Sequence, residues 1–145
     1  MKVNIKKLNE KAIIPTYGSP YSAGADLYAC IESDVTIDPG QTVLIKTGLA
    51  MELEVGYVAL IYARSGLASK KGLAPANKVG VVDCDYRGEI MVALHNHSTK
   101  QQTVAQGERI AQMVIAPYIT AEFNEVDSLS ETVRGCGGFG STGNK

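Results

Sequence analysis

The sequence lacks the features that mark several classes of protein. It has no tryptophan, and its 3 cysteines among 145 residues form no CxxC pair. This argues against a disulfide framework and favours reduced thiols in a cytoplasmic protein. No apolar run approaches the ~18 residues of a membrane span, and no apolar block near the first residue indicates a signal peptide.

Charge of one sign is also missing. The 14 basic and 15 acidic residues leave a net charge of -1, which gives none of the electrostatic footprint of a protein that binds duplex nucleic acid or an anionic membrane. With 45% hydrophobic and 20% charged residues, the chain is not disordered as a whole. Its length favours one domain, residues 1–145, with a core over residues 1–119.

Alternating apolar and β-branched residues dominate what is present, and turn signals recur about every 8–12 residues, which favours an all-β sandwich or barrel. One segment, residues 65–72, predicts a short helix, with Ser65 available as the N-cap and Gly72 just beyond the last turn. Strands are expected near Val3 and Ile5 and over residues 34–37, 42–47, 57–62, 79–82, 89–94 and 109–115.

The last part of the chain, residues 120–145, differs in composition. Residues 134–143 contain five glycines and a single large apolar side chain, Phe139. Such a segment buries too little surface to offset its own ordering entropy. It is either a loose end or a lid that a ligand or a neighbouring chain orders.

The arginines are few, and each of the four lies within two residues of a glycine. A guanidinium suits bidentate phosphate binding, and a nearby glycine lets backbone N–H groups reach the same anion. Arg64, Ser65 and Gly66 give the strongest local signal, either an anion site where a helix begins or a plain helix cap. Arg87 and Arg109 are better interpreted as turn residues at strand ends.

Carboxylates supply the other candidates. Asp83 ends an apolar strand, where it can take a proton from water or cap a turn, and the nearby Tyr86 can form a flat wall for a sugar or base. Asp26 lies among small residues and is either a structural carboxylate or part of a Mg²⁺ site. His95 and His97 fit an edge-strand pair better than a metal site, and Lys70 and Lys71 are typical of solvated surface.

Taken together, five segments resemble the ordered motifs of the trimeric deoxyuridine triphosphatases, the dUTPase family. Any one of them is weak evidence, but their order and spacing fit over almost the whole chain. They are AGADLYA at residues 23–29, ARSGLA at 63–68, GVVDCDYRGE at 80–89, GERIAQ at 107–112 and RGCGGFGSTG at 134–143.

The resemblance implies a jelly-roll-like β-clip fold, a homotrimer with shared active sites, and Mg²⁺-assisted hydrolysis of dUTP to dUMP and pyrophosphate. Asp83 would be the general base and Asp26 would position the waters of Mg²⁺. Substrate-binding roles are implied for Arg64, Ser65, Gly66, Asn77, Val82, Tyr86 and Gln112, and in the arm for Arg134, Phe139, Gly140, Ser141 and Thr142.

Two alternatives stay open. A deaminase of the same fold, acting on dCTP, would need an acid or base for its amino leaving group, whereas the segment at residues 80–89 follows the dUTPase pattern. A nucleotide-binding module without turnover would not need the full set of catalytic residues.

Overall fold

The computed structural model describes residues 1–138, and within them it forms short strands and one helix. The prediction of an all-β chain with a single short helix is confirmed. No helix among these residues is long and apolar enough to cross a membrane. In chain order the elements are β1 (Asn4–Lys7), β2 (Thr16–Tyr17), β3 (Ala25–Tyr28), β4 (Val35–Ile37), β5 (Thr42–Lys46), β6 (Leu49–Glu52), β7 (Tyr57–Tyr62), α1 (Ser65–Lys71), β8 (Leu73–Pro75), β9 (Gly80–Val82), β10 (Met91–Asn96), β11 (Gln102–Val104) and β12 (Arg109–Pro117).

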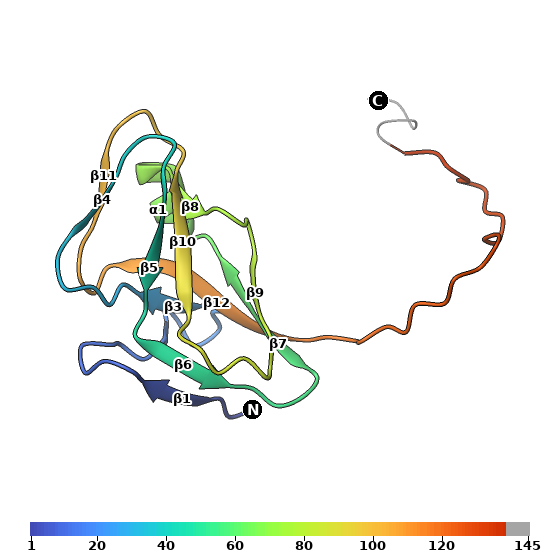
Figure 1. The fold of residues 1–145 in the computed structure, drawn as a ribbon, viewed down its shortest axis with the longest axis horizontal. Coiled ribbons are helices and arrows are strands. Elements are labelled where there is room, and N and C mark those ends of the chain that lie inside the picture. The colour runs from blue at the N-terminus through green and yellow to red at the C-terminus, as the bar shows by residue number, and fades with distance from the viewer. Residues whose placement is uncertain (139–145) are drawn as a thin grey trace.

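The strands pair antiparallel into one large sheet and three small ones (Figure 1). The large sheet has the order β2-β3-β12-β7-β9, a second has the order β5-β10-β8, and β1-β6 and β11-β4 form ladders of two strands. Burying alternate side chains of these sheets against one another removes their apolar faces from water. Leu27, Ile37, Ile45, Leu94 and Ile110 are completely buried in this core.

The helix is correctly predicted, but its N-cap is not Ser65. Arg64 has the extended backbone of an N-cap, its carbonyl accepts the amide of Ala68 at 2.9 Å, and Ser65 is the first helical residue. Gly72 ends the helix with a left-handed φ of 67°, which glycine adopts without strain. The cap prediction failed because a serine between a strand and a helix looks like an N-cap in the sequence. Whether it is the N-cap depends on the exact residue at which the helix begins, and the helix begins one residue earlier than predicted.

Asn96, at the end of β10, joins three parts of the fold. Its side chain is fully buried and donates to the carbonyls of Ile37 at 2.9 Å and Lys100 at 2.8 Å. Its Oδ1 accepts from the amide and the hydroxyl of Ser98. A buried amide with all these bonds made fixes β4, β10 and the following loop relative to one another.

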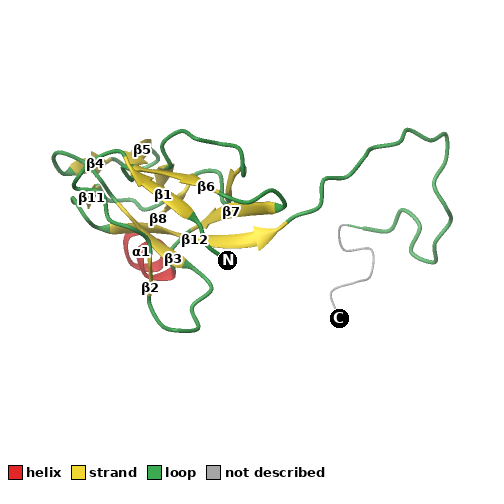
Figure 2. Cartoon of the chain, turned by 90° about the horizontal axis from the view of Figure 1, so that it is seen from below, coloured by secondary structure: helices red, strands yellow, loops and turns green. Residues whose placement is uncertain are grey.

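After β12 and Tyr118 the chain leaves the folded body, and from residue 120 it runs as an extended arm (Figure 1, Figure 2). The Tyr118 amide still bonds to the Gly56 carbonyl at 3.0 Å. Beyond it, Ile119, Phe123 and Leu129 are almost fully exposed. These apolar side chains therefore lie in water and are not packed against residues 1–138.

Candidate active site

A cavity of 420 Å³ opens where β3, β12 and the start of α1 meet. We call it the arginine cavity. Asp26 on β3 pairs with Gln112 on β12, and Gln112 pairs in turn with Tyr62 at the end of β7, so three neighbouring strands bring these positions into one row. The residues that line the cavity are Gly18, Ser22, Ala23, Gly24, Asp26, Arg64, Ser65, Gly66, Arg109 and Gln112.

Asp26 binds two arginines at the wall of this cavity. Arg64 Nε lies 2.7 Å from Asp26 Oδ1, and Arg109 Nη1 lies 3.2 Å from Oδ2. The Asp26 side chain is only 12% exposed, whereas those of Arg64 and Arg109 are 25% and 52% exposed. One carboxylate therefore anchors two guanidinium groups, and the exposed N–H donors of both are free to meet an anion in the cavity.

Gln112 is held in place from two sides. Its Nε2 donates to the Ala63 carbonyl at 2.9 Å, just before Arg64. On the other side it packs so closely over Gly24 that a Cβ at that position would collide with Gln112 Oε1. Glycine at position 24 thus keeps the amide of Gln112 aimed along the cavity wall.

Ser65 and Gly66 form the part of the wall that belongs to α1. Both are exposed, and a Cβ built on Gly66 would meet no atom within 4 Å. The backbone there is open to a ligand, and the first turn of the helix supplies amides without intrahelical partners.

A second, smaller cavity of 240 Å³ contains Asp83, and we call it the Asp83 pocket. Apolar side chains form most of its wall, and Asp83 follows directly after β9. A turn bond from the Tyr86 amide to the Asp83 carbonyl, at 3.2 Å, places the two side chains on one loop. The lining residues are Leu44, Val81, Val82, Asp83, Tyr86, Glu89, Ile90 and Met91.

The loop that carries Asp83 is braced by its own residues. Tyr86 Oη donates to the Glu89 carbonyl at 3.1 Å, and its ring packs where a Cβ on Gly88 would lie. Arg87 Nη1 donates to the Cys84 carbonyl at 2.7 Å, the role expected of a turn arginine. The Tyr86 ring is thereby fixed while 44% of the residue stays exposed.

Cys84 connects this loop to the start of the arm. Its Sγ lies 3.6 Å from Tyr118 Oη, and the hydrogen bond between them raises the pKa of the Tyr118 phenol. A different thiol, that of Cys30, lines neither cavity, and burial raises its pKa. The Cys30 thiol is accordingly protonated near neutral pH.

The β7–β9 ladder separates the two cavities within one chain. Val82, just before Asp83, pairs with Ala59 on β7, and Arg64 comes five residues after Ala59, between the end of β7 and α1. At ~3.4 Å per residue, the extended chain from Ala59 to Arg64 spans about 17 Å, and Asp83 lies beyond Ala59 on the side away from Arg64. In Figure 1, α1 accordingly lies at the upper end of the body, and the chain after β9 descends towards β6 at the lower end.

The profile of the dUTPase family matches residues 10–143 of this chain. The chain belongs to the dUTPase family. Among curated relatives, the deoxyuridine 5'-triphosphate nucleotidohydrolase of Nautilia profundicola is 54% identical over 143 residues, which cover 99% of each chain. The protein of that name from Desulfitobacterium hafniense is 52% identical over 144 residues, which cover 99% of this chain and 95% of that protein.

Solved dUTPase structures share this fold. A point mutant of the phage 80alpha dUTPase superposes with a TM-score of 0.88 at 28% identity, covering 97% of this chain and 98% of that one. The Staphylococcus phage 80alpha dUTPase with dUPNHPP gives a TM-score of 0.85 at 28% identity, with 98% of each chain covered. The jelly-roll-like architecture predicted from the sequence is confirmed.

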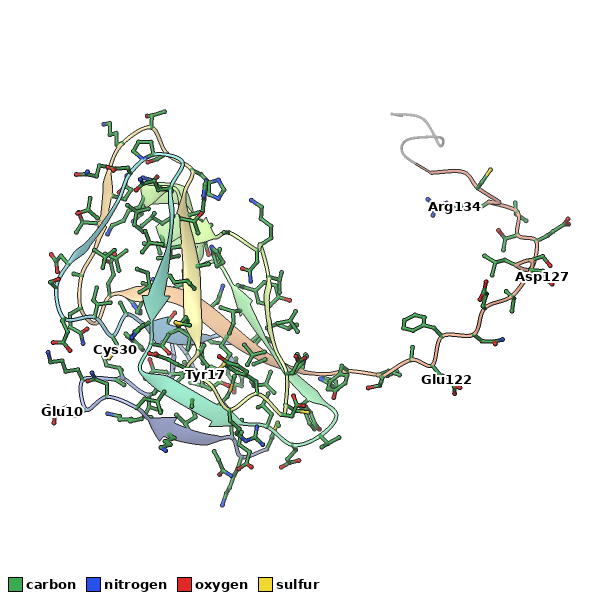
Figure 3. The ribbon with its side chains drawn as sticks, in the orientation of Figure 1. Glu10, Tyr17, Cys30, Glu122, Asp127 and Arg134 are labelled. Carbon is green, nitrogen blue, oxygen red and sulfur yellow. The ribbon has the colours of Figure 1, made fainter. Side chains whose placement is uncertain are left out.

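The structure gathers most of the predicted site residues of this dUTPase in the two cavities and places the other described ones elsewhere. The arginine cavity gathers those from three of the resembling segments, and the Asp83 pocket gathers Val82, Asp83 and Tyr86. Asn77 lies before β9 and lines neither cavity, and Arg134 lies on the arm, away from the body (Figure 3). Phe139, Gly140, Ser141 and Thr142 lie outside the described residues.

Sequence reasoning missed Arg109 as part of the site. It was interpreted as a turn residue, yet it lines the arginine cavity and pairs with Asp26. The signal was its place in the segment GERIAQ, at the start of a strand with a polar Gln112 in the middle. Gly24 was seen only as a neighbour of Asp26, and its packing against Gln112 depends on the pairing of β3 with β12.

The donor set at Asp26 fits Mg²⁺ rather than a transition metal. Among residues 1–138 no three His, Cys, Asp or Glu side chains come together as metal ligands. Within the same described part of the chain, Asp26 is the only carboxylate that lines the arginine cavity. Mg²⁺ keeps several waters and takes one or two carboxylates together with substrate phosphates, so one carboxylate beside an anion cavity suits it.

Proposed function

We propose that Asp83 primes the water with which this chain hydrolyses dUTP to dUMP and pyrophosphate, by attack on the α-phosphorus. The observation that supports it best is an exposed carboxylate on a braced loop, in a pocket whose other walls are mostly apolar. A carboxylate accepts the proton of a water within hydrogen-bond reach. Asp83 thus serves as the general base, and its loop holds it beside the nucleoside.

The phosphates belong in the arginine cavity. Arg64 and the exposed backbone at Ser65 and Gly66 supply donors, and Gln112 supplies an amide that Gly24 keeps in place. Phosphoryl transfer needs positioning and charge neutralisation more than covalent help from the protein. Arg109, anchored on Asp26, joins the residues proposed from the sequence.

The nucleoside belongs in the Asp83 pocket. Tyr86 stacks against the deoxyribose and leaves no room for a 2′-hydroxyl, and Val82 contributes apolar wall. The backbone and side chain of Asn77 read uracil, since a fixed N–H favours its O4 over the amino group of cytosine. A site tuned to one hydrogen-bond pattern rejects the other strongly.

Mg²⁺ is the proposed cofactor, held through water by Asp26. When bound, it neutralises charge on the phosphate oxygens. A solved relative, a mutant of the phage phi11 dUTPase, is described as coordinating a structural Mg(II) ion. Asp26, with its side chain mostly buried and already balanced by Arg64 and Arg109, is the carboxylate of this chain that faces the phosphates.

The complete site is proposed to span the subunits of a homotrimer. Asp83 and Arg64 of one chain lie towards opposite ends of β7 and line different cavities, so one chain does not gather both around one nucleotide. A neighbouring copy supplies the second of the two cavities that a complete site needs. The arm, residues 120–145, with its lid at residues 134–143, closes the site through Arg134, Phe139, Gly140, Ser141 and Thr142, and its exposed apolar side chains pack on a neighbour.

The proposal includes a setting for this chemistry. The chain acts as a single domain in the cytoplasm, where removing dUTP keeps uracil out of DNA and supplies dUMP for the synthesis of dTMP. Neither nucleic acid nor a membrane is a partner, in keeping with its net charge of -1.

Pyrophosphate release from dUTP, dCTP, dTTP and UTP, with and without a chelator, tests the proposal. Turnover should be confined to dUTP, because the Asp83 pocket accepts uracil and excludes a 2′-hydroxyl. The chelator should suppress this turnover. Comparable rates on all four nucleotides would refute the assignment of the pocket, and ammonia release from dCTP would point to deamination.

A further inference from the structure

A third cavity, of 410 Å³, runs along the side of α1, and we call it the helix groove. It shares Arg64, Gly66 and Arg109 with the arginine cavity, so the two adjoin. Gly66 and Lys70 are four residues apart and therefore share one face of the helix. The groove is lined by Arg64, Gly66, Leu67, Lys70, Lys71, Glu108 and Arg109.

Positive charge exceeds negative charge in this groove. Lys71 Nζ pairs with Glu108 Oε1 at 2.6 Å and also reaches the Thr103 carbonyl at 3.2 Å, so it fastens α1 to the chain before β12. The two arginines share the single carboxylate of Asp26. Lys70 is exposed, lines the groove, and makes no hydrogen bond or ion pair among residues 1–138.

We propose that the helix groove binds inorganic pyrophosphate as it leaves the arginine cavity, with Lys70 as its anion-binding cation. The proposal rests on the proposed function, because pyrophosphate is the product of that reaction. The groove adjoins the arginine cavity through Arg64, Gly66 and Arg109, so it is the nearest cationic surface to an anion that leaves that cavity. An ammonium with no internal partner gives a charge-assisted hydrogen bond to such an anion.

Lys70 is also well placed to act without disturbing the fold. It lies on the exposed side of the last helical turn, next to Lys71, which carries the structural ion pair. Replacing Lys70 therefore removes charge from the groove and leaves the packing of α1 through Leu67 intact. The two neighbouring lysines, which look alike in the sequence, have different tasks.

Calorimetric titration of the full-length protein with pyrophosphate, in magnesium-free buffer at low salt, tests this. Lys70→Gln should weaken pyrophosphate binding about fivefold, as for the loss of a partly exposed ion pair, and Lys70→Arg should restore most of it. Lys100→Gln makes the same change of charge on an exposed loop after β10 and should leave binding unchanged. The affinity for dUMP should be the same in all variants.

Two results would overturn the proposal. One is pyrophosphate binding by Lys70→Gln that equals that of the unaltered protein. The other is a rise in KM for dUTP as large as the loss of pyrophosphate affinity, since the groove would then hold the substrate's own terminal phosphate. Failure of the proposed function would be seen separately, as an absence of dUTP turnover by the unaltered protein, while Lys70-dependent pyrophosphate binding would still establish the groove as a diphosphate site.

Discussion

Asp26 shows how one side chain can prepare an anion site. Its two oxygens each hold one guanidinium, so the cavity presents oriented N–H donors before any ligand enters. Two unpaired arginines side by side would repel each other and sample many rotamers. The carboxylate removes both costs, and preorganised donors stabilise developing charge without reorganisation.

Replacing Asp83 with asparagine tests the general base. Asp83→Asn keeps the size of the side chain on its braced loop but removes its basicity, so kcat should fall about 10²–10⁴-fold. The affinity for a non-hydrolysable dUTP analogue should change little. Pyrophosphate release and calorimetry give the two numbers, and full activity would remove Asp83 from this role.

Adding a methyl group at position 24 tests whether the close packing of Gly24 against Gln112 positions the Gln112 side chain. Gly24→Ala places a Cβ against the Gln112 side chain and should lower the free energy of unfolding by about 1–3 kcal/mol, with a higher KM for dUTP. In a Gln112→Ala background the same change should cost much less, because the obstructing amide is gone. Equal costs in both backgrounds would show that the strain lies elsewhere.

Site residues that are close in the sequence could be predicted to share a pocket. Residues that only strand pairing brings together could not. Asp83 and Tyr86 share one loop, so their spacing alone predicts a common pocket. Arg109 and Asp26 meet only because β12 pairs with β3 in one register, with an irregularity just after Arg109. A one-residue slip would turn alternate side chains to the opposite face, and nothing local in the sequence fixes that choice.

At the scale of elements, length and alternation determined what could be predicted. The strand expected over residues 57–62 is β7 itself, because a run of six apolar and aromatic residues after Gly56 suffices to define it. Short strands such as β2, β6 and β8 were missed, and β8 ends in a proline, which argues locally against a strand. Such strands form because distant partners offer them hydrogen bonds.

Asn96 makes a prediction about how the elements hold together. Asn96→Ala deletes four side-chain hydrogen bonds, among them the buried one to the Ile37 carbonyl, so it should lower the free energy of unfolding by about 3 kcal/mol. Asn124→Ala, on the exposed arm, is the matched control. Thermal unfolding at one fixed protein concentration measures both, and a shift of similar size in the two variants would contradict the assignment.

Truncation tests the arm. The described residues after Val133 bond only with one another and with Thr132, so a chain that ends at Val133 should fold and assemble as before. It should nevertheless lose about 10²-fold or more in turnover, because the donors that cover the phosphates are gone. Unchanged kinetics of the shortened chain would refute the role of the arm as a lid.

At the scale of the whole molecule, the distance between the two cavities leads to a complementation test. Asp83→Asn and Arg64→Gln should each be nearly inactive alone. In mixed trimers made by refolding the two together, about a quarter of the sites should combine an intact Asp83 with an intact Arg64 from different copies.

Turnover of the mixture should therefore rise above that of either variant. The matched control mixes Asp83→Asn with a chain altered at both positions, which leaves no site intact. A mixture as inactive as its components would show that one chain supplies both halves.

Because the β7–β9 ladder separates the two cavities, it also determines how much activity a defective copy removes from the proposed trimer. In the proposed trimer each copy lends Asp83 to one pocket and its arginine cavity to another. One copy that is defective at both positions therefore inactivates two of the three pockets, even when the other two copies are intact. In an equal mixture of intact and defective copies about a quarter of the pockets stay complete, so the activity lost exceeds the defective share of the protein.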